Sequence, residues 1–116
     1  MGKIEVRPLS GRGTDIVYSN QNNVKKVIWG KTIFFIPNDL IDKILNEYFF
    51  DADAWYPLGA DMMKPIPGGL GEFVKNEHPN FSPRHATVIA AIMHHEKLIT
   101  FKNAKPILLK RMCESI

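Results

Sequence analysis

The sequence predicts an α+β fold in which an N-terminal antiparallel β-meander precedes helices and a C-terminal β-hairpin. Residues 1–36 repeatedly alternate apolar and polar side chains, which is the two-residue period of a half-buried strand. Residues 38–50 and 83–97 instead carry apolar side chains at helical spacing. Two short apolar runs with a basic segment between them occupy residues 98–112. A chain of 116 residues is long enough for one domain with a modest hydrophobic core.

The expected strands of the meander follow from the alternation and from the turns between them. Lys3–Arg7 alternates strictly, and a second strand-like run follows a glycine-containing loop. The polar run Asn20–Asn23 predicts a turn, because asparagine tolerates a left-handed backbone. Two further runs, over residues 24–29 and 31–36, meet at Gly30. We therefore expect an antiparallel arrangement of neighbouring strands in the first 36 residues.

The last of these runs leads directly into a helix. Ile33–Ile36 is apolar on both faces, which predicts a central strand covered by helices. Pro37 ends the strand, and Asn38 or Asp39 can cap the helix that follows over residues 38–50. Its apolar positions recur at helical spacing and are Leu40, Ile41, Ile44, Leu45 and Tyr48.

Residues 51–69 form a segment rich in proline, glycine and aromatic side chains. Three of the eight prolines and three of the eight glycines fall here, so we expect an irregular loop. Large aromatic residues gather at its start, and these are Phe49, Phe50, Trp55 and Tyr56. Such residues can line a ligand pocket, form an interface or close a core over a sheet.

The helix over residues 83–97 has the clearest start signal. Phe81, Ser82 and Pro83 place an apolar staple residue, a capping hydroxyl and a first-turn proline in order. One side of the helix is apolar, and the opposite side carries Arg84, Thr87, Ala90, Ala91, His94 and Lys97. Small residues surrounded by hydrogen-bonding groups suit the major groove of DNA, where an arginine can bind guanine. A solvated helix face and a helix–helix dimer seam are the alternatives.

Residues 70–112 resemble a winged helix-turn-helix domain in the order of their elements. An amphipathic stretch, Leu70–Asn76, is followed by the turn Pro79–Ser82, the helix from Pro83 and the hairpin. The resemblance implies that this helix enters the major groove of double-stranded DNA and that the hairpin lysines bind backbone phosphate. It also implies a homodimer that matches two half-sites. The DNA-binding residues are then Arg84, Thr87, His94, Lys97, Lys102 and Lys105.

The charge of the chain is concentrated in its second half. Residues 59–116 contain eight Lys or Arg and five Asp or Glu, so the whole net charge of +3 lies there. A basic hairpin can meet phosphate, although exposed lysines also serve ordinary solvation and protect sheet edges.

We find no catalytic motif, and we expect no metal and no cofactor. The spacing of His78, His85, His94 and His95 does not pair ligands on one helix face, and His85 is expected to be a structural histidine. A hydrolase or nuclease is a distant third function, because nothing places a nucleophile beside a base. The single Cys113, the absence of an apolar leader and the shortness of the apolar runs predict a soluble cytoplasmic protein without a membrane partner.

Two functions therefore remain open. The first is a DNA-binding transcriptional regulator that uses residues 70–112. The second is a non-catalytic protein that binds a small-molecule ligand or oligomerises through the aromatic loop of residues 49–67.

Overall fold

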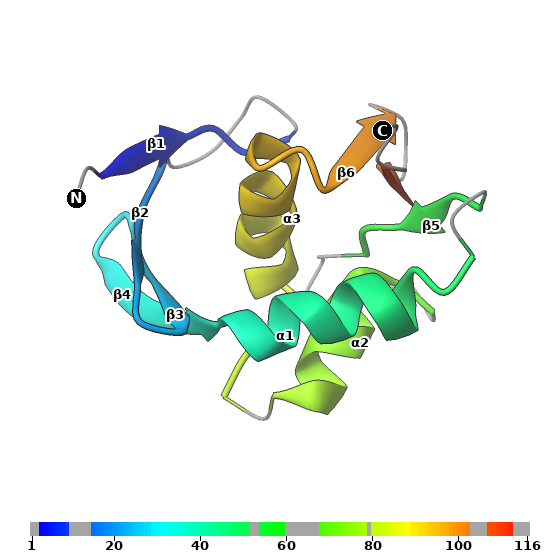
Figure 1. The fold of residues 1–116 in the computed structure, drawn as a ribbon, viewed down its shortest axis with the longest axis horizontal. Helices are drawn as coiled ribbons and strands as arrows, with labels where there is room; N and C mark the ends of the chain where they lie inside the picture. Colours follow the sequence, from blue (N-terminus) through cyan, green and yellow to red (C-terminus); the bar gives the residue numbers. More distant parts are fainter. Residues whose placement is uncertain are drawn as a thin grey trace.

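In the computed structural model one helix, α3 (His85–His95), lies between two antiparallel sheets, with the other helices beneath them (Figure 1). The structure describes residues 3–9, 15–51, 54–59, 68–78, 80–102 and 107–112. The predicted α+β class is confirmed.

The N-terminal sheet is the meander that the alternating sequence predicted. Its four strands are β1 (Ile4–Val6), β2 (Ile16–Gln21), β3 (Val24–Trp29) and β4 (Thr32–Pro37). They pair antiparallel in chain order. Two-residue turns connect β2 to β3 and β3 to β4, and they contain Asn23 and Gly30, each with φ of 61°. The asparagine in the predicted polar turn thus has the left-handed backbone expected of it.

β4 is the edge of this sheet, so the prediction of a central strand covered by helices was wrong. Ile33 is 58% exposed and Phe35 is 50% exposed, whereas Ile36 is fully buried. Successive side chains of a strand point to opposite faces, so Ile33 and Phe35 share the face that looks away from the core. A strand that is apolar on both faces can have one neighbouring strand or two, so the sequence does not distinguish an edge from a central position. Here the chain enters helix α1 directly after β4.

The helix expected over residues 38–50 begins at the predicted place but changes its winding. It consists of α1 (Asn38–Lys43) and a π-helical turn, η1 (Ile44–Tyr48), closed by a hydrogen bond of 3.0 Å from the Phe49 N–H to the Ile44 carbonyl. The wider turn lets Tyr48 and Phe49 both enter the core, although they are adjacent in sequence. No side-chain capping bond forms at the start of α1.

The predicted amphipathic stretch near residue 70 is helix α2 (Leu70–Glu77). Its first turn touches the backbone of the preceding loop, because the Gly71 N–H donates to the Leu58 carbonyl at 2.9 Å. A Cβ atom on Gly71 would collide with the carbonyl oxygen of Gly59. Glycine at this position is what permits α2 to pack so closely.

α3 is shorter and more deeply buried than expected. It contributes Ala86 and the whole run Val88–Met93 to the core, and each of these residues is fully buried. The helix was predicted from Pro83 to Lys97, with Ser82 as its cap. Instead the segment from Ser82 begins as a tight turn, in which the His85 N–H bonds to the Ser82 carbonyl at 3.0 Å. No side-chain cap forms at the start of the helix.

The C-terminal end of α3 is closed by backbone bonds. Lys97 has a φ of 63°, which is a left-handed conformation unusual for lysine. Its N–H bonds to the His94 carbonyl at 3.0 Å, and the Leu98 N–H bonds to the Met93 carbonyl at 2.9 Å. This pair of bonds is a Schellman motif, which usually has glycine at the position occupied by Lys97.

The C-terminal hairpin forms a second sheet together with a strand that the sequence did not indicate. The strands are β5 (Tyr56–Pro57), β6 (Ile99–Lys102) and β7 (Leu108–Arg111), in the order β5-β7-β6. The hairpin pairs with two residues of the loop 51–69, a length too short to give a periodic pattern. Within the described ranges, no helix has the length and apolar character needed to cross a bilayer.

Candidate functional site

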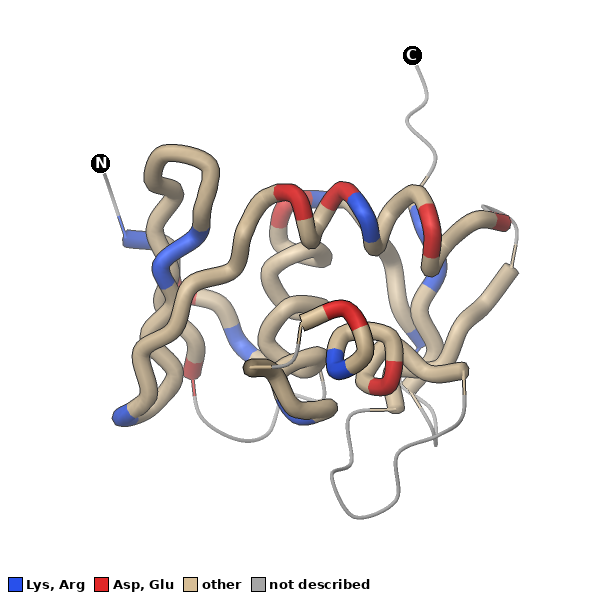
Figure 2. Tube along the Cα trace, turned by 90° about the horizontal axis from the view of Figure 1, so that it is seen from below, with Lys and Arg blue, Asp and Glu red and all other residues tan. Residues whose placement is uncertain are grey.

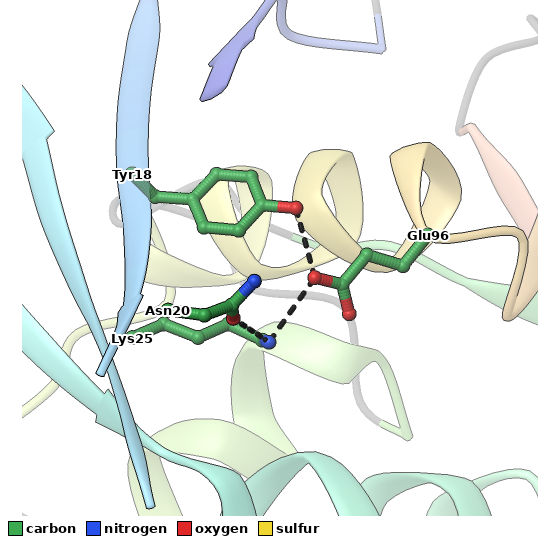
Figure 3. Close-up of polar contacts among 4 residues, drawn as sticks. All are labelled: Tyr18, Asn20, Lys25 and Glu96. Atoms are coloured by element: carbon green, nitrogen blue, oxygen red, sulfur yellow. Dashed lines mark hydrogen bonds and ion pairs between the residues drawn. The ribbon is translucent and has the colours of Figure 1, made fainter. Parts of the chain in front are cut away.

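The polar residues that lie deepest in the fold connect α3 to the N-terminal sheet (Figure 3). Lys25 on β3 is 7% exposed, and its Nζ lies 3.1 Å from Glu96 Oε2 and 2.7 Å from Asn20 Oδ1. The hydroxyl of Tyr18 on β2 donates to the same Glu96 oxygen at 2.8 Å. Burial, and then the hydrogen bond to Glu96, raise the pKa of Tyr18 above its ordinary value, so the hydroxyl remains protonated and donating.

This network was not found from the sequence. Lys25 shares a strand face with Val27 and Trp29, which is a signal that it points inward, but no local pattern indicates the carboxylate 71 residues away. Each polar atom of Lys25, Tyr18 and Glu96 in the network is engaged by another protein group. The arrangement therefore fixes the end of α3 against the sheet and leaves little capacity for chemistry.

The expected DNA-reading side of α3 is not a continuous surface. Ala90 and Ala91 were expected at its exposed centre, and both are fully buried. Arg84 and His94 are exposed at opposite ends of the helix, and Thr87 between them is half-buried. Ala90 and Ala91 are buried because both sheets and the lower helices pack around α3. An amphipathic pattern within the helix does not predict how many neighbours surround it.

The residues at the ends of α3 instead contact aromatic rings. The Arg84 guanidinium carbon lies 5.4 Å from the centre of the Trp29 ring. The His94 ring meets the edge of Phe101 at 4.9 Å between centroids. Lys97 is exposed in the turn that ends the helix.

His85 belongs to an aromatic stack at the start of α3. The ring of Phe81 stacks on His85 at 4.8 Å and on His78 at 4.2 Å between centroids. The Ser82 N–H donates to His85 Nδ1 at 3.0 Å, and burial lowers the pKa of this imidazole. His85 is thus a hydrogen-bonded histidine whose ring packs against its aromatic neighbours. No group of three or more metal-ligating side chains comes together in the described part of the chain.

The aromatic residues around the loop divide between core and surface. Phe49 is fully buried, and its ring lies 5.5 Å from that of Tyr56. Phe50 is 77% exposed at the outer end of this group. Phe49 therefore packs in the core and does not line a ligand surface, whereas Trp55 lies apart from it beside two lysines.

Trp55, Lys102 and Lys110 form a cluster on the C-terminal sheet. The Lys102 Nζ lies 4.3 Å from the centre of the Trp55 ring, and the Lys110 Nζ lies 5.7 Å from it. Side chains alternate between the two faces of a strand. Ile99 on β6 and Leu109 on β7 are fully buried, so Lys102 and Lys110, which point the opposite way on the same strands, occupy the outer face. We call these three residues the Trp55 cluster. Lys105, the other predicted phosphate contact, lies outside the described residues.

A hollow lies beside this face, at the end of α3. It has a volume of about 630 Å³, and its lining includes Arg7, His94, His95, Lys97 and Thr100. Thr100 is the direct cross-strand partner of Lys110, so the hollow borders the strands that carry the Trp55 cluster. Glu5 contributes the one carboxylate of the lining.

The C-terminal strands carry positive charge without compensation. Residues 97–112 contain five Lys or Arg and no Asp or Glu. Among the described residues, acidic positions are most frequent on α1, η1 and α2 (Figure 2). Among the described residues the ion pairs are Arg7–Asp15, Lys25–Glu96 and Lys43–Glu77, so neither Lys102 nor Lys110 has a carboxylate partner there.

Comparison with known proteins adds no relative: no family model, no curated protein and no solved structure matches this chain.

Proposed function

We propose that the protein binds nucleic acid through the outer face of its C-terminal sheet, with the Trp55 cluster at the centre of the binding surface. The observation that carries this proposal is the pair of lysines around one tryptophan ring, at 4.3 Å and 5.7 Å from its centre. The two ammonium groups have no carboxylate partner among the described residues. Both positive charges are therefore available to phosphate.

A tryptophan between lysines is suited to a single strand. Proteins that bind single-stranded DNA or RNA combine a basic surface that follows the backbone with aromatic rings on which bases stack. The lysine ammonium groups are held near the ring by cation–π attraction of only about 0.5–1 kcal/mol at exposed sites, so a phosphate can draw them away. The ring then becomes free for an unpaired base.

This proposal keeps the nucleic-acid partner expected from the resemblance to winged helix-turn-helix domains, and with it a role in transcriptional regulation. It transfers the binding surface from the helix to the hairpin. The burial of Ala90 and Ala91 speaks against insertion of α3 into a major groove, which needs close approach along the helix. The hollow at the end of α3 is lined by Thr100, the cross-strand partner of Lys110, and it supplies a direction in which the nucleic-acid strand can continue.

The test is the anisotropy of a labelled oligonucleotide, single-stranded or duplex, titrated with protein over a range of salt. We expect the single strand to bind more tightly at low salt. Lys102→Ala with Lys110→Ala should weaken binding and reduce the log–log salt slope by roughly 0.7 for each phosphate that the lysines no longer neutralise. Trp55→Ala should cost about 1–3 kcal/mol on the single strand, and Trp55→Phe should retain most of the affinity.

Lys75→Ala is the matched control, because it removes an exposed lysine from α2, in the acidic part of the molecule. Arg84→Ala tests the helix separately and should leave binding unchanged. Equal reductions in affinity from Lys75→Ala and from the Lys102 and Lys110 substitutions would contradict the proposed face. Failure of the wild-type protein to bind either oligonucleotide at low salt would contradict the function itself.

A further inference from the structure

The outer edge of β4 is unusually open for an edge strand. Its sequence from Thr32 to Pro37 contains no charged residue, and within the described ranges no strand pairs with that edge. Natural proteins commonly protect such edges with lysines, bulges or covering segments, because unpaired N–H and C=O groups invite another strand. Among the described residues, the proline at the very end of β4 is the one such device.

The exposed apolar side chains of the sheet lie on this same strand. Ile33 and Phe35 are at least half exposed, and both are on the outer face. Further from the edge, the same face bears Lys3, Ser19 and Lys26 around a shallow hollow of about 140 Å³. Val17 and Ile28 continue this face but are half-buried, so the most exposed apolar side chains of the sheet are those at the edge.

We infer that β4 pairs antiparallel with β4 of a second copy of this chain, so that two four-stranded sheets join into one. In a two-fold pair centred on Phe34, Ile33 faces Phe35 of the second copy, and the reverse contact forms on the other side of the axis. The four side chains then make one apolar cluster on the outer face. Direct cross-strand pairs of an aromatic and a β-branched residue are among the favourable ones.

The charges that flank β4 fit the same arrangement. Lys31 precedes the strand and Asp39 follows it, and both side chains are exposed. Neither has an ion-pair partner within the described residues. Antiparallel pairing brings the Lys31 end of each strand to the Asp39 end of the other, so opposite charges meet at both ends. A parallel pair would bring like charges together.

The oligomeric state in solution tests this inference, and it is independent of nucleic-acid binding. Sedimentation velocity at micromolar concentrations should show a dimer for the native chain. Phe35→Lys and Ile33→Lys should each raise the dimer dissociation constant by at least about tenfold, as truncation of a central interface residue does. Both residues are exposed in the single chain, and an unchanged circular-dichroism spectrum would verify that the fold persists.

Ile28→Lys is the matched control, because Ile28 pairs directly with Ile33 but lies one strand inward. If the dimer forms through the β4 edge, Ile28→Lys should leave the dimer dissociation constant unchanged. A charge exchange provides a second test: Lys31→Glu and Asp39→Lys should each weaken the dimer, and the double variant should restore it. A native monomer, a dimer insensitive to Phe35→Lys, or a dimer abolished by Ile28→Lys alone would each overturn the inference.

Discussion

Lys25 and Glu96 form the deepest ion pair among the described residues, with their charged atoms 3.1 Å apart and their positions 71 apart in the sequence. The lysine side chain is 8% exposed and the glutamate side chain 26%. A charge so buried is tolerated only with a partner. Here Asn20 accepts a further hydrogen bond from the lysine, and Tyr18 donates one to the glutamate.

Removing one member of this pair should therefore be costly. Glu96→Ala leaves the Lys25 ammonium buried without a counter-charge, and we expect a decrease of about 3 kcal/mol in the free energy of unfolding measured by urea titration. The double variant Lys25→Met with Glu96→Ala should be less destabilised, because no buried charge remains. Equal destabilisation in the single and double variants would show that the loss does not come from an unpaired lysine charge.

The stability of the protein should fall in strong alkali. Burial raises the pKa values of Tyr18 and Tyr48 above the ordinary value near 10. Their contribution is complete below that value and is lost as the pH rises, because the unfolded chain ionises first. Each tyrosine adds up to about 1.4 kcal/mol per pH unit to the slope. Chemical denaturation between pH 9 and about 11 should show a shallower fall for Tyr18→Phe; an identical slope would contradict this.

Replacing Lys97 in the turn after α3 by glycine should stabilise the protein. Lys97 has a φ of 63°, which costs lysine energy that glycine does not lose. Lys97→Gly should raise the free energy of unfolding by about 0.5–1 kcal/mol, after allowance for the greater freedom of the unfolded chain. Lys75→Gly is the control, since the same substitution inside α2 should instead destabilise by about 1 kcal/mol. Destabilisation of similar size in both variants would argue against strain at Lys97.

Gly71 should tolerate no side chain. A methyl group there would collide with the backbone oxygen of Gly59, which cannot rotate away as a side chain would. We expect Gly71→Ala to lower the free energy of unfolding by about 1–3 kcal/mol, measured by thermal melting. Gly68 has open space around the same position but a φ of +79°, so Gly68→Ala would report backbone strain alone. An unchanged free energy of unfolding in Gly71→Ala would mean that α2 can shift away from Gly59 at little cost.

The parts of the fold that depend on local pattern were predictable, and those that depend on distant neighbours were not. Alternation and turn residues indicated the strands of the meander, because both act over a few residues. The position of β4 at an edge, the burial of Ala90 on all sides and the inward Lys25 each depend on elements far away in sequence. The same holds for the candidate site: Lys102 was identified from charge, whereas its approach to Trp55 needed the fold.

The pairing of β5 with β7 has a consequence for how the chain folds. Tyr56 must find Leu109, which lies far away in sequence, whereas two-residue turns join β2 to β3 and β3 to β4. Contacts of long sequence separation form slowly, since the intervening chain must first lose its freedom. During synthesis the meander can therefore assemble while α3 still has one side uncovered. The side of α3 that packs on β6 is then shielded only when the C-terminal sheet closes, so the exposure of this apolar helix depends on the slower of the two sheets.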